Sequence, residues 1–308
     1  MSVIRPLERD DLPQVAILYE SVSRSGSTTP PRGLAGYFER TLLDHPWADP
    51  EIPSLVNLNE QGTVRGFIES HVRRLSLEGR PILMACGGQL VSDPAVRNRA
   101  AGRLLLRRFF AGPQDLTITD GATEATRRMW RGLGESVGRL GSISWVRLFD
   151  WGAAGEQALE GFGMAPWRPV VRPVLSAEMP AVRSRGELVK RLIRDGDRVL
   201  GWYVAYLQRW GLSQVMQIPA RNRDVAGVLD HLFHDAQSAG VAALTGQLGP
   251  SLFEALPQRS RRCFLHLSAN FLVHSRNPEV LNPILLGQAM ITRMDGERWM
   301  GHHLESFT

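Results

Sequence analysis

The residues with the clearest chemical meaning follow one apolar strand. Residues 90–105 read LVSDPAVRNRAAGRLL, in which an apolar run passes through a loop of small and basic residues into a helical pattern. A helix that begins in such a loop directs unsatisfied backbone N–H groups, and the positive end of its dipole, at one point. The pattern predicts a phosphate site, although close packing of small residues is an alternative explanation.

Basic residues gather around this loop. Eight arginines between Arg97 and Arg131 face only Asp115, Asp120 and Glu124, a local charge of +5 that equals the formal net charge of the whole chain. Because 35 of the 36 basic residues are arginine, part of the high pI reflects composition. We therefore expect an anionic ligand near this segment, while the arginines later in the helix equally suit a solvated face.

Two residues on a neighbouring strand are candidates for proton transfer. Glu69 and His71 are two positions apart, so in a strand their side chains point to the same face. A carboxylate or an imidazole there can accept a proton from a reacting group. Glu69 also suits a solvent-facing position, and Cys86, within an apolar strand, is predicted to be a small core residue rather than a reactive nucleophile.

The histidines of the second half give no metal site. His231 and His234 are three positions apart on a predicted helix beside Asp230 and Asp235, but the sequence offers no third ligand. These residues, like His302 and His303, are expected on the surface. No metal is predicted.

Hydrophobic periodicity predicts the elements that hold these residues. In the first half we expect a strand near the N-terminus, two helices, an antiparallel hairpin, and then alternating strands and helices. The expected ranges are 3–7, 12–22, 34–43, 54–58, 63–72, 81–91, 99–110, 116–119, 122–133 and 142–149. The last strand is expected to close this unit.

The second half repeats this order. Glycine and proline punctuate residues 150–197, where one short helix is predicted at 186–194. Strands and helices then return at 199–207, 212–218, 224–239, 241–248, 250–256 and 264–273. The repeated order, with Arg221-Asn222-Arg223 echoing Arg97-Asn98-Arg99, predicts an internal architectural repeat.

In two motifs the chain resembles the GNAT superfamily of acyl-CoA-dependent acyltransferases. The signature V-x-x-P followed by R/Q-x-x-G-x-G/A is matched by Val91, Pro94, Arg97, Ala100 and Gly102, with alanine replacing the first glycine. A second family pattern, N-x-x-A-x-x-L-Y-x-x-x-G-F, keeps its spacing in the following helix and loses its asparagine and tyrosine.

The lost tyrosine matters for mechanism. In many members of the family this phenol hydrogen-bonds or protonates the departing thiolate. Here Trp130 holds its position, and an indole N–H cannot serve as a general acid. Trp130 is instead expected to pack on the pantetheine arm.

The resemblance implies an α/β chain of two tandem GNAT-like domains, each a mostly antiparallel mixed sheet flanked by helices. It places an acyl-CoA-binding domain at 1–150, a junction at 151–198 and a degenerate second domain at 199–308. It implies acetyl-CoA or another acyl-CoA as donor, a small-molecule amine as acceptor, and catalysis by Glu69 and His71. The implied cofactor-binding residues are Val91, Ser92, Arg97, Asn98, Arg99, Ala100, Ala101, Gly102, Arg103 and Trp130.

Two other functions stay open. The chain suits a non-catalytic acyl-CoA-binding or scaffold protein, and a tandem layout also occurs in aminoacyl-tRNA-dependent transferases. A nucleic-acid partner is the weaker expectation, since no platform of aromatic and basic residues stands out.

The composition limits the class of protein and the cellular compartment that the sequence predicts. Hydrophobic residues make up 43% and charged residues 22%, which is ordinary for a folded globular protein. The sequence predicts neither a membrane segment nor a signal peptide, and its two cysteines form no disulfide framework, so a cytoplasmic protein is expected.

Overall fold

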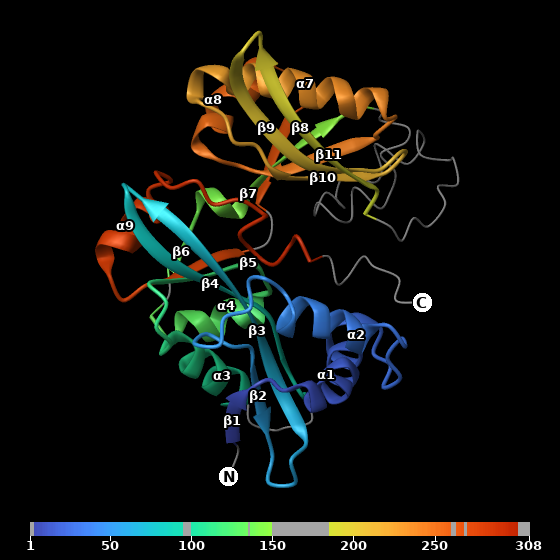
Figure 1. Ribbon diagram of the computed structural model, residues 1–308, viewed down its shortest axis with the longest axis vertical. Coiled ribbons are helices and arrows are strands. Elements are labelled where there is room, and N and C mark those ends of the chain that lie inside the picture. Colours follow the sequence, from blue (N-terminus) through green and yellow to red (C-terminus); the bar gives the residue numbers. More distant parts are fainter. Residues whose placement is uncertain are drawn as a thin grey trace.

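The first β-sheet gathers seven strands from both ends of the chain (Figure 1). This computed structural model describes residues 3–94, 100–134, 136–149, 185–259, 263–267 and 270–300. In spatial order the strands are β1 (Val3–Pro6), β2 (Leu55–Leu58), β3 (Val64–Leu77), β4 (Arg80–Ser92), β5 (Leu116–Ala122), β13 (Asn270–His274) and β6 (Ser136–Val137). All neighbours are antiparallel except β4 and β5, which are parallel.

The second sheet has six strands and, like the first, contains one parallel pair. In spatial order these are β12 (Cys263–Leu267), β7 (Ile143–Leu148), β11 (Ala243–Gln247), β10 (Leu212–Gln217), β9 (Arg198–Leu207) and β8 (Glu187–Asp195). Again a single parallel pair, β10 with β11, lies among antiparallel neighbours. The predicted α/β class with two mixed sheets is confirmed.

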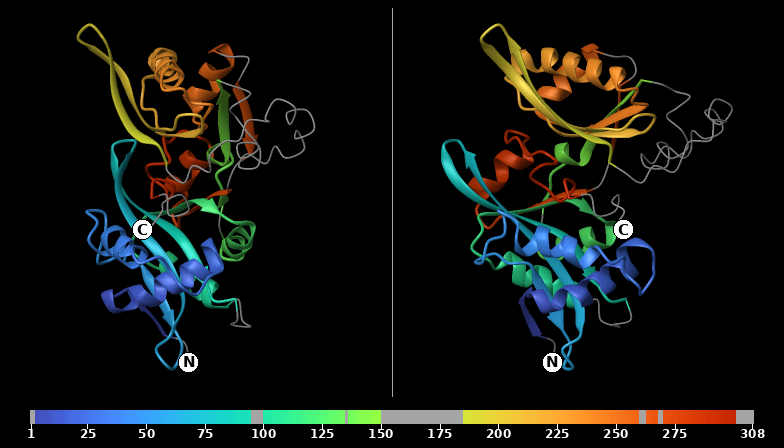
Figure 2. Two further views of the ribbon diagram at one scale, coloured as in Figure 1. Left: turned by 90° about the vertical axis from the view of Figure 1, so that its right-hand side faces the viewer. Right: turned by 45° about the vertical axis from the view of Figure 1, so that its right-hand side comes forward.

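The two sheets exchange one strand each. β7 follows the first sheet's β6 in sequence but pairs with β11 and β12, and β13 crosses back to lie between β5 and β6. Both views of Figure 2 show β7, in green, among the yellow and orange strands of the second half.

Two sequence expectations are wrong as a result. Residues 142–149 do not close the first unit, and the single strand expected at 264–273 is two strands in different sheets. Apolarity marks a segment as a buried strand, but it does not encode which neighbour the strand pairs with.

Helices cover both faces of the first sheet. The helices α1 (Leu12–Tyr19) and α2 (Leu34–Phe38) pack on Phe67, whereas α3 (Ala100–Phe110) packs on its neighbour Ile68. Successive side chains of a strand point to opposite faces, so these two residues of β3 anchor two layers. α4 (Glu124–Arg131) lies on the α3 side. The helices predicted at 12–22 and 34–43 both end in a wider π-helical turn.

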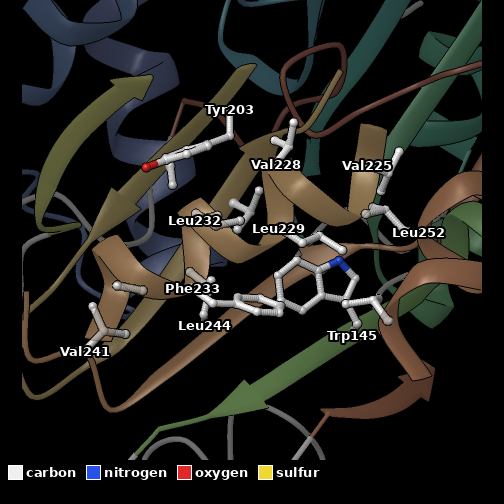
Figure 3. Packing of buried hydrophobic residues seen from close by; sticks show 14 of the residues in the cluster. Trp145, Tyr203, Val225, Val228, Leu229, Leu232, Phe233, Val241, Leu244 and Leu252 are labelled. Carbon is white, nitrogen blue, oxygen red and sulfur yellow. The ribbon is translucent and has the colours of Figure 1, made fainter. Parts of the chain in front are cut away.

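The core of the second sheet forms under α7 (Val225–Ser238) and α8 (Pro250–Arg259), and α9 (Pro278–Leu285) follows β13. Figure 3 shows Trp145, supplied by β7, lying beside Leu229 and Phe233 of α7. Trp145 is fully buried, with its ring centroid 6.1 Å from that of Phe233. Burial of side chains this large contributes roughly 1.5–3 kcal/mol each, which fixes the exchanged strand in the second sheet.

The helix predicted at 186–194 is instead β8. The segment pairs with β9 along its length, and the turn Gly196-Asp197 joins β8 to β9 as a hairpin. Gly196 has φ +59°, a conformation that glycine adopts at little cost. The expected junction therefore includes a strand of the second sheet, while residues 150–184 lie outside the described part.

Among the helices of the described residues, none has the length and apolarity to cross a bilayer.

Candidate functional site

The candidate site lies where β4 and β5 part. Their pairing ends at Cys86 and Ile118, although both strands continue. Just beyond this point β4 contains a bulge, because Gln89 and Leu90 together oppose the single residue Ile68 on β3. Gln89 has φ +38°, and a bulge of this kind turns the backbone out of the regular ladder.

The carboxylate of Glu297 fills this opening. One oxygen, Oε2, accepts a hydrogen bond from the backbone N–H of Gln89 at 2.8 Å, and Oε1 accepts one from the Thr119 hydroxyl at 2.8 Å. Glu297 therefore connects β4 to β5 where the two strands no longer pair with each other. Its side chain is buried.

A second carboxylate, that of Glu69, lies beside the same glycine. A Cβ atom added to Gly88 would lie 2.9 Å from Glu297 Oε2 and 3.0 Å from Glu69 Oε2. Only glycine leaves room there for both groups. Glu69 is fully buried, so the solvent-facing alternative is wrong. Two carboxylates in so small a buried volume repel each other unless a proton or a cation joins them.

Asp120, on β5, fixes the segment that carries Glu297. Its Oδ1 accepts the backbone N–H of Glu297 at 2.8 Å, and its carbonyl accepts Nε of Arg298 at 3.1 Å. Burial raises the pKa of Asp120 to about 6, with the nearby charge of Glu297 adding to the effect and Arg298 opposing it. The site therefore contains a third acidic group that is protonated more readily than an exposed aspartate.

His71 faces the same segment of the chain. Its ring centroid is 5.4 Å from that of Trp299 and 6.0 Å from that of His45, and all three rings form one wall. Burial and the charge of Arg73 lower the pKa of His45, which favours its neutral form. Glu69 and His71 thus face residues 297–299 together, in line with their spacing.

Cys86 is paired with His71 across the β3–β4 ladder and is fully buried. Burial raises the pKa of its thiol well above the usual range, and the neighbouring carboxylates add to this. A thiol held protonated is a poor nucleophile, which agrees with the prediction of a core residue.

The structure describes only some residues of the predicted phosphate loop. Arg97, Asn98 and Arg99 lie outside the described residues. Val91 and Ser92 end β4, where they pair with Phe67 and Gly66 of β3.

The predicted site residues of α3 lie in its first turn. α3 begins at Ala100 and continues through Ala101, Gly102 and the exposed Arg103. A Cβ atom on Gly102 would lie 3.1 Å from Met129 Sδ, so this glycine lets α3 approach α4 closely.

Trp130 lies in the core rather than at the opening. It is fully buried among the side chains of α3 and α4, and its ring centroid is 4.7 Å from that of Phe110. A side chain without exposed surface cannot contact a pantetheine arm in this conformation. The structure therefore corrects the expectation for this residue.

The two helical histidines of the second half, His231 and His234, are exposed on α7. Within the part of the chain that the structure describes, no cluster of three or more histidine, cysteine, aspartate or glutamate side chains is arranged to hold a metal ion.

Sequence reasoning missed the C-terminal contribution to the site. Glu297, Trp299 and their anchor Asp120 come together across more than 170 residues, as the separation of 177 between Glu297 and Asp120 shows. The one local signal was Gly87-Gly88 inside a strand, which indicates a close approach by another group.

No protein-family model matches the sequence, and comparison with curated proteins gives no match. Solved structures show the fold. A GCN5-related N-acetyltransferase from Anabaena variabilis ATCC 29413 is 12% identical, with a TM-score of 0.57 over 90% of this chain and 73% of that chain. A probable N-acyltransferase from Enterococcus faecalis V583 is 10% identical, with a TM-score of 0.58 over 89% and 73%.

A third structure, a GCN5-related N-acetyltransferase from Kribbella flavida, is 13% identical, with a TM-score of 0.51 over 89% of this chain and 72% of that chain. The predicted GNAT fold is therefore confirmed. At these identities the similarity concerns the fold, and activity has to be argued from the site.

Proposed function

We propose that the chain transfers an acyl group from acyl-CoA to a primary amine at the opening between β4 and β5. The observation that carries the proposal is the buried pair of carboxylates, Glu297 and Glu69, at the bulge of β4. Two GCN5-related N-acetyltransferases that share the fold support it.

The β4 edge suits the donor. Beyond Cys86 this edge no longer pairs with β5, and an extended chain with amide groups can add to such an edge as a strand does. Main-chain groups of Val91 and Ser92 are the proposed partners of the pantetheine amides. Residues 97–103, the last four of which form the first turn of α3, are the proposed partners of the pyrophosphate. Acyl-CoA supplies a thioester carbonyl that an amine can attack.

The acidic residues are proposed to manage the acceptor's proton. An amine is protonated at neutral pH and attacks only after losing a proton to a base. Glu297 takes this role, since it lies at the bulge itself, and Glu69 beside it favours an incoming cation. His71 lies at the aromatic wall next to this pair and is the proposed route for the proton away from Glu297. Glu297 thereby joins Glu69 and His71, the two catalytic residues expected from the sequence.

One observation favours a second function. The Gln89 N–H, the donor that the bulge directs into the opening, is bonded to Glu297. With this group engaged and the family's tyrosine replaced by the core residue Trp130, the chain also suits a protein that binds acyl-CoA without turnover.

A paired assay separates these functions. Acetyl-CoA and longer acyl-CoAs are titrated calorimetrically, and thiol release is then followed with a panel of amino sugars, polyamines and lysine peptides. We expect binding together with thiol release that Glu297→Gln abolishes while binding persists. The matched control is Glu254→Gln, at an exposed position of α8, which should leave both unchanged.

The other outcomes are equally informative. Binding without thiol release for any acceptor establishes the binding function instead. Failure of all the acyl-CoAs to bind overturns both.

A further inference from the structure

A cavity of about 630 Å³ lies where the other parallel pair of strands parts, and its lining also includes Leu140, Gly141 and Phe271. The pairing of β10 with β11 ends at Gln214 and Thr245, and the cavity is lined by the continuations of both strands, the start of α8 and residues 286–293. Its size is that of ordinary small-molecule sites, which occupy roughly 300–1,000 Å³. Among the described residues, neither those of the first turn of α3 nor the carboxylate pair lines it.

One wall carries a buried cation, Arg293, which is 3% exposed. Its Nη2 donates to the Ser144 hydroxyl at 3.2 Å, and its Nη1 donates to the carbonyl of Thr245 at 3.3 Å. These contacts to β7 and β11 hold the guanidinium in one orientation. Burial lowers the pKa of Arg293 to about 9, so the group is still charged at neutral pH.

The charge of Arg293 has no close counterion in the described part of the chain. Its hydrogen-bond partners are neutral, and Asp120 acts on it only at longer range. A buried guanidinium without an anionic partner is costly, because neutral acceptors replace only part of its hydration. An anion in the cavity would offset this cost and form charge-assisted hydrogen bonds.

The other walls contain both polar and apolar residues, and the apolar ones are more numerous. The polar residues include Gln217, Gln247 and Thr292, and the apolar ones include Met216, Ile218, Leu252 and Ile284. At the surface two further lining residues, Leu286 and Met290, are 71% and 57% exposed. Apolar side chains exposed to this extent beside a cavity are typical of a binding site for an apolar group.

We propose that this cavity binds a medium-chain aliphatic carboxylate, with the carboxylate against Arg293 and the chain along the apolar wall toward Leu286 and Met290. A planar carboxylate matches the fork of a guanidinium, whereas an inorganic anion leaves the apolar wall without a partner. The proposal is independent of acyl transfer, because its ligand is a free acid and its residues lie outside the first site.

The test is calorimetric titration of the full chain with decanoate below its micellar concentration. Decanol, decylamine and acetate are the comparison ligands. We expect decanoate to bind, and decanol, decylamine and acetate each to bind at least about tenfold more weakly, since hydrogen bonds to a charged group are worth roughly 1.5–3 kcal/mol. Equal affinities for decanoate and decanol would overturn the role of Arg293.

Two variants test the location. Arg293→Gln should weaken decanoate binding at least about tenfold. Gly249→Trp places a large side chain at a cavity-lining position where a Cβ atom meets nothing within 4 Å, and it should abolish binding. Arg194→Gln, at an exposed position of β8, is the charge control and should bind as the wild type does.

The second variant keeps the proposal testable if Arg293→Gln fails to fold. Decanoate binding that survives Gly249→Trp would place the ligand elsewhere and overturn the proposal. Acetyl-CoA binding should be unchanged in Gly249→Trp, and its loss would assign this cavity to the acyl donor instead.

Discussion

The carboxylate of Glu297 accepts the backbone N–H of Gln89 at 2.8 Å, although 208 residues separate the two in the sequence. The contact joins the C-terminal part of the described chain to the bulge of β4. Its partner Thr119 lies on β5, so one side chain from outside the first half bridges the opening of the first sheet. Changes at β4, at β5 or at Glu297 should therefore act on the same site.

Gly88→Ala should disrupt the carboxylate pair. The new methyl group would lie 2.9 Å from Glu297 and 3.0 Å from Glu69, so at least one side chain has to move. We expect a loss of about 1–3 kcal/mol in the free energy of unfolding, measured in urea, and a loss of acyl transfer.

The control for this change is Gly227→Ala in α7, where the methyl group meets only Leu200 at 3.7 Å. This variant should gain up to about 1 kcal/mol, because alanine favours a helix. Equal stability of Gly88→Ala and the wild type would show that the two carboxylates are not confined at this glycine.

Asp120→Asn should remove a pH dependence of stability. The folded pKa of Asp120, about 6, lies above its ordinary value of 3.8, so the folded protein retains a proton that the unfolded chain releases. This group destabilises the fold progressively as pH rises from about 4 to about 6, by roughly 3 kcal/mol in total. Asparagine does not titrate.

The measurement for this prediction is urea unfolding of both proteins between pH 4 and pH 7. The wild type should lose stability relative to Asp120→Asn across that range and show no further relative change above it. Asp197→Asn, at an exposed position of the β8–β9 turn, should show no such trend. A constant difference for Asp120→Asn would mean that Asp120 titrates normally.

Trp130 should behave as a core residue. Trp130→Ala is expected to cost about 3–5 kcal/mol in unfolding free energy, because it empties the space beside Phe110. Trp130→Phe should cost less and leave the affinity for acetyl-CoA unchanged, as measured by calorimetry. A selective loss of affinity in Trp130→Phe, at nearly unchanged stability, would restore the pantetheine contact expected from the sequence.

Local patterns predicted much of the fold. The hairpin of β2 and β3, the helices α3 and α7 and the common face of Glu69 and His71 all follow from periodicities of 2 and 3.6 residues. The repeat of the two sheets also followed from the order of elements. These features depend on neighbours in the sequence, so the sequence contains what is needed to predict them.

The rest of the site depends on partners far apart in the chain. Residues 286–300 show neither periodicity, yet they place Arg293 on one cavity and Glu297 at the opening of the first sheet. Nothing local indicates that β7 belongs with β11 or that Glu297 meets Gln89. Such pairings are decided by the packing of the whole chain, and a single sequence does not reveal them.

The exchanged strands predict that the two halves cannot fold separately. A fragment of residues 1–149 lacks β13, whose Leu272 and Val273 are fully buried in the first half, and it exposes Trp145 of β7. Unpaired edges and exposed aromatic side chains favour aggregation. We expect no cooperative unfolding transition for this fragment alone, whereas coexpression with residues 150–308 should restore both sheets and give one transition. A fragment 1–149 that unfolds cooperatively on its own would mean that the first sheet is stable without the strand it receives.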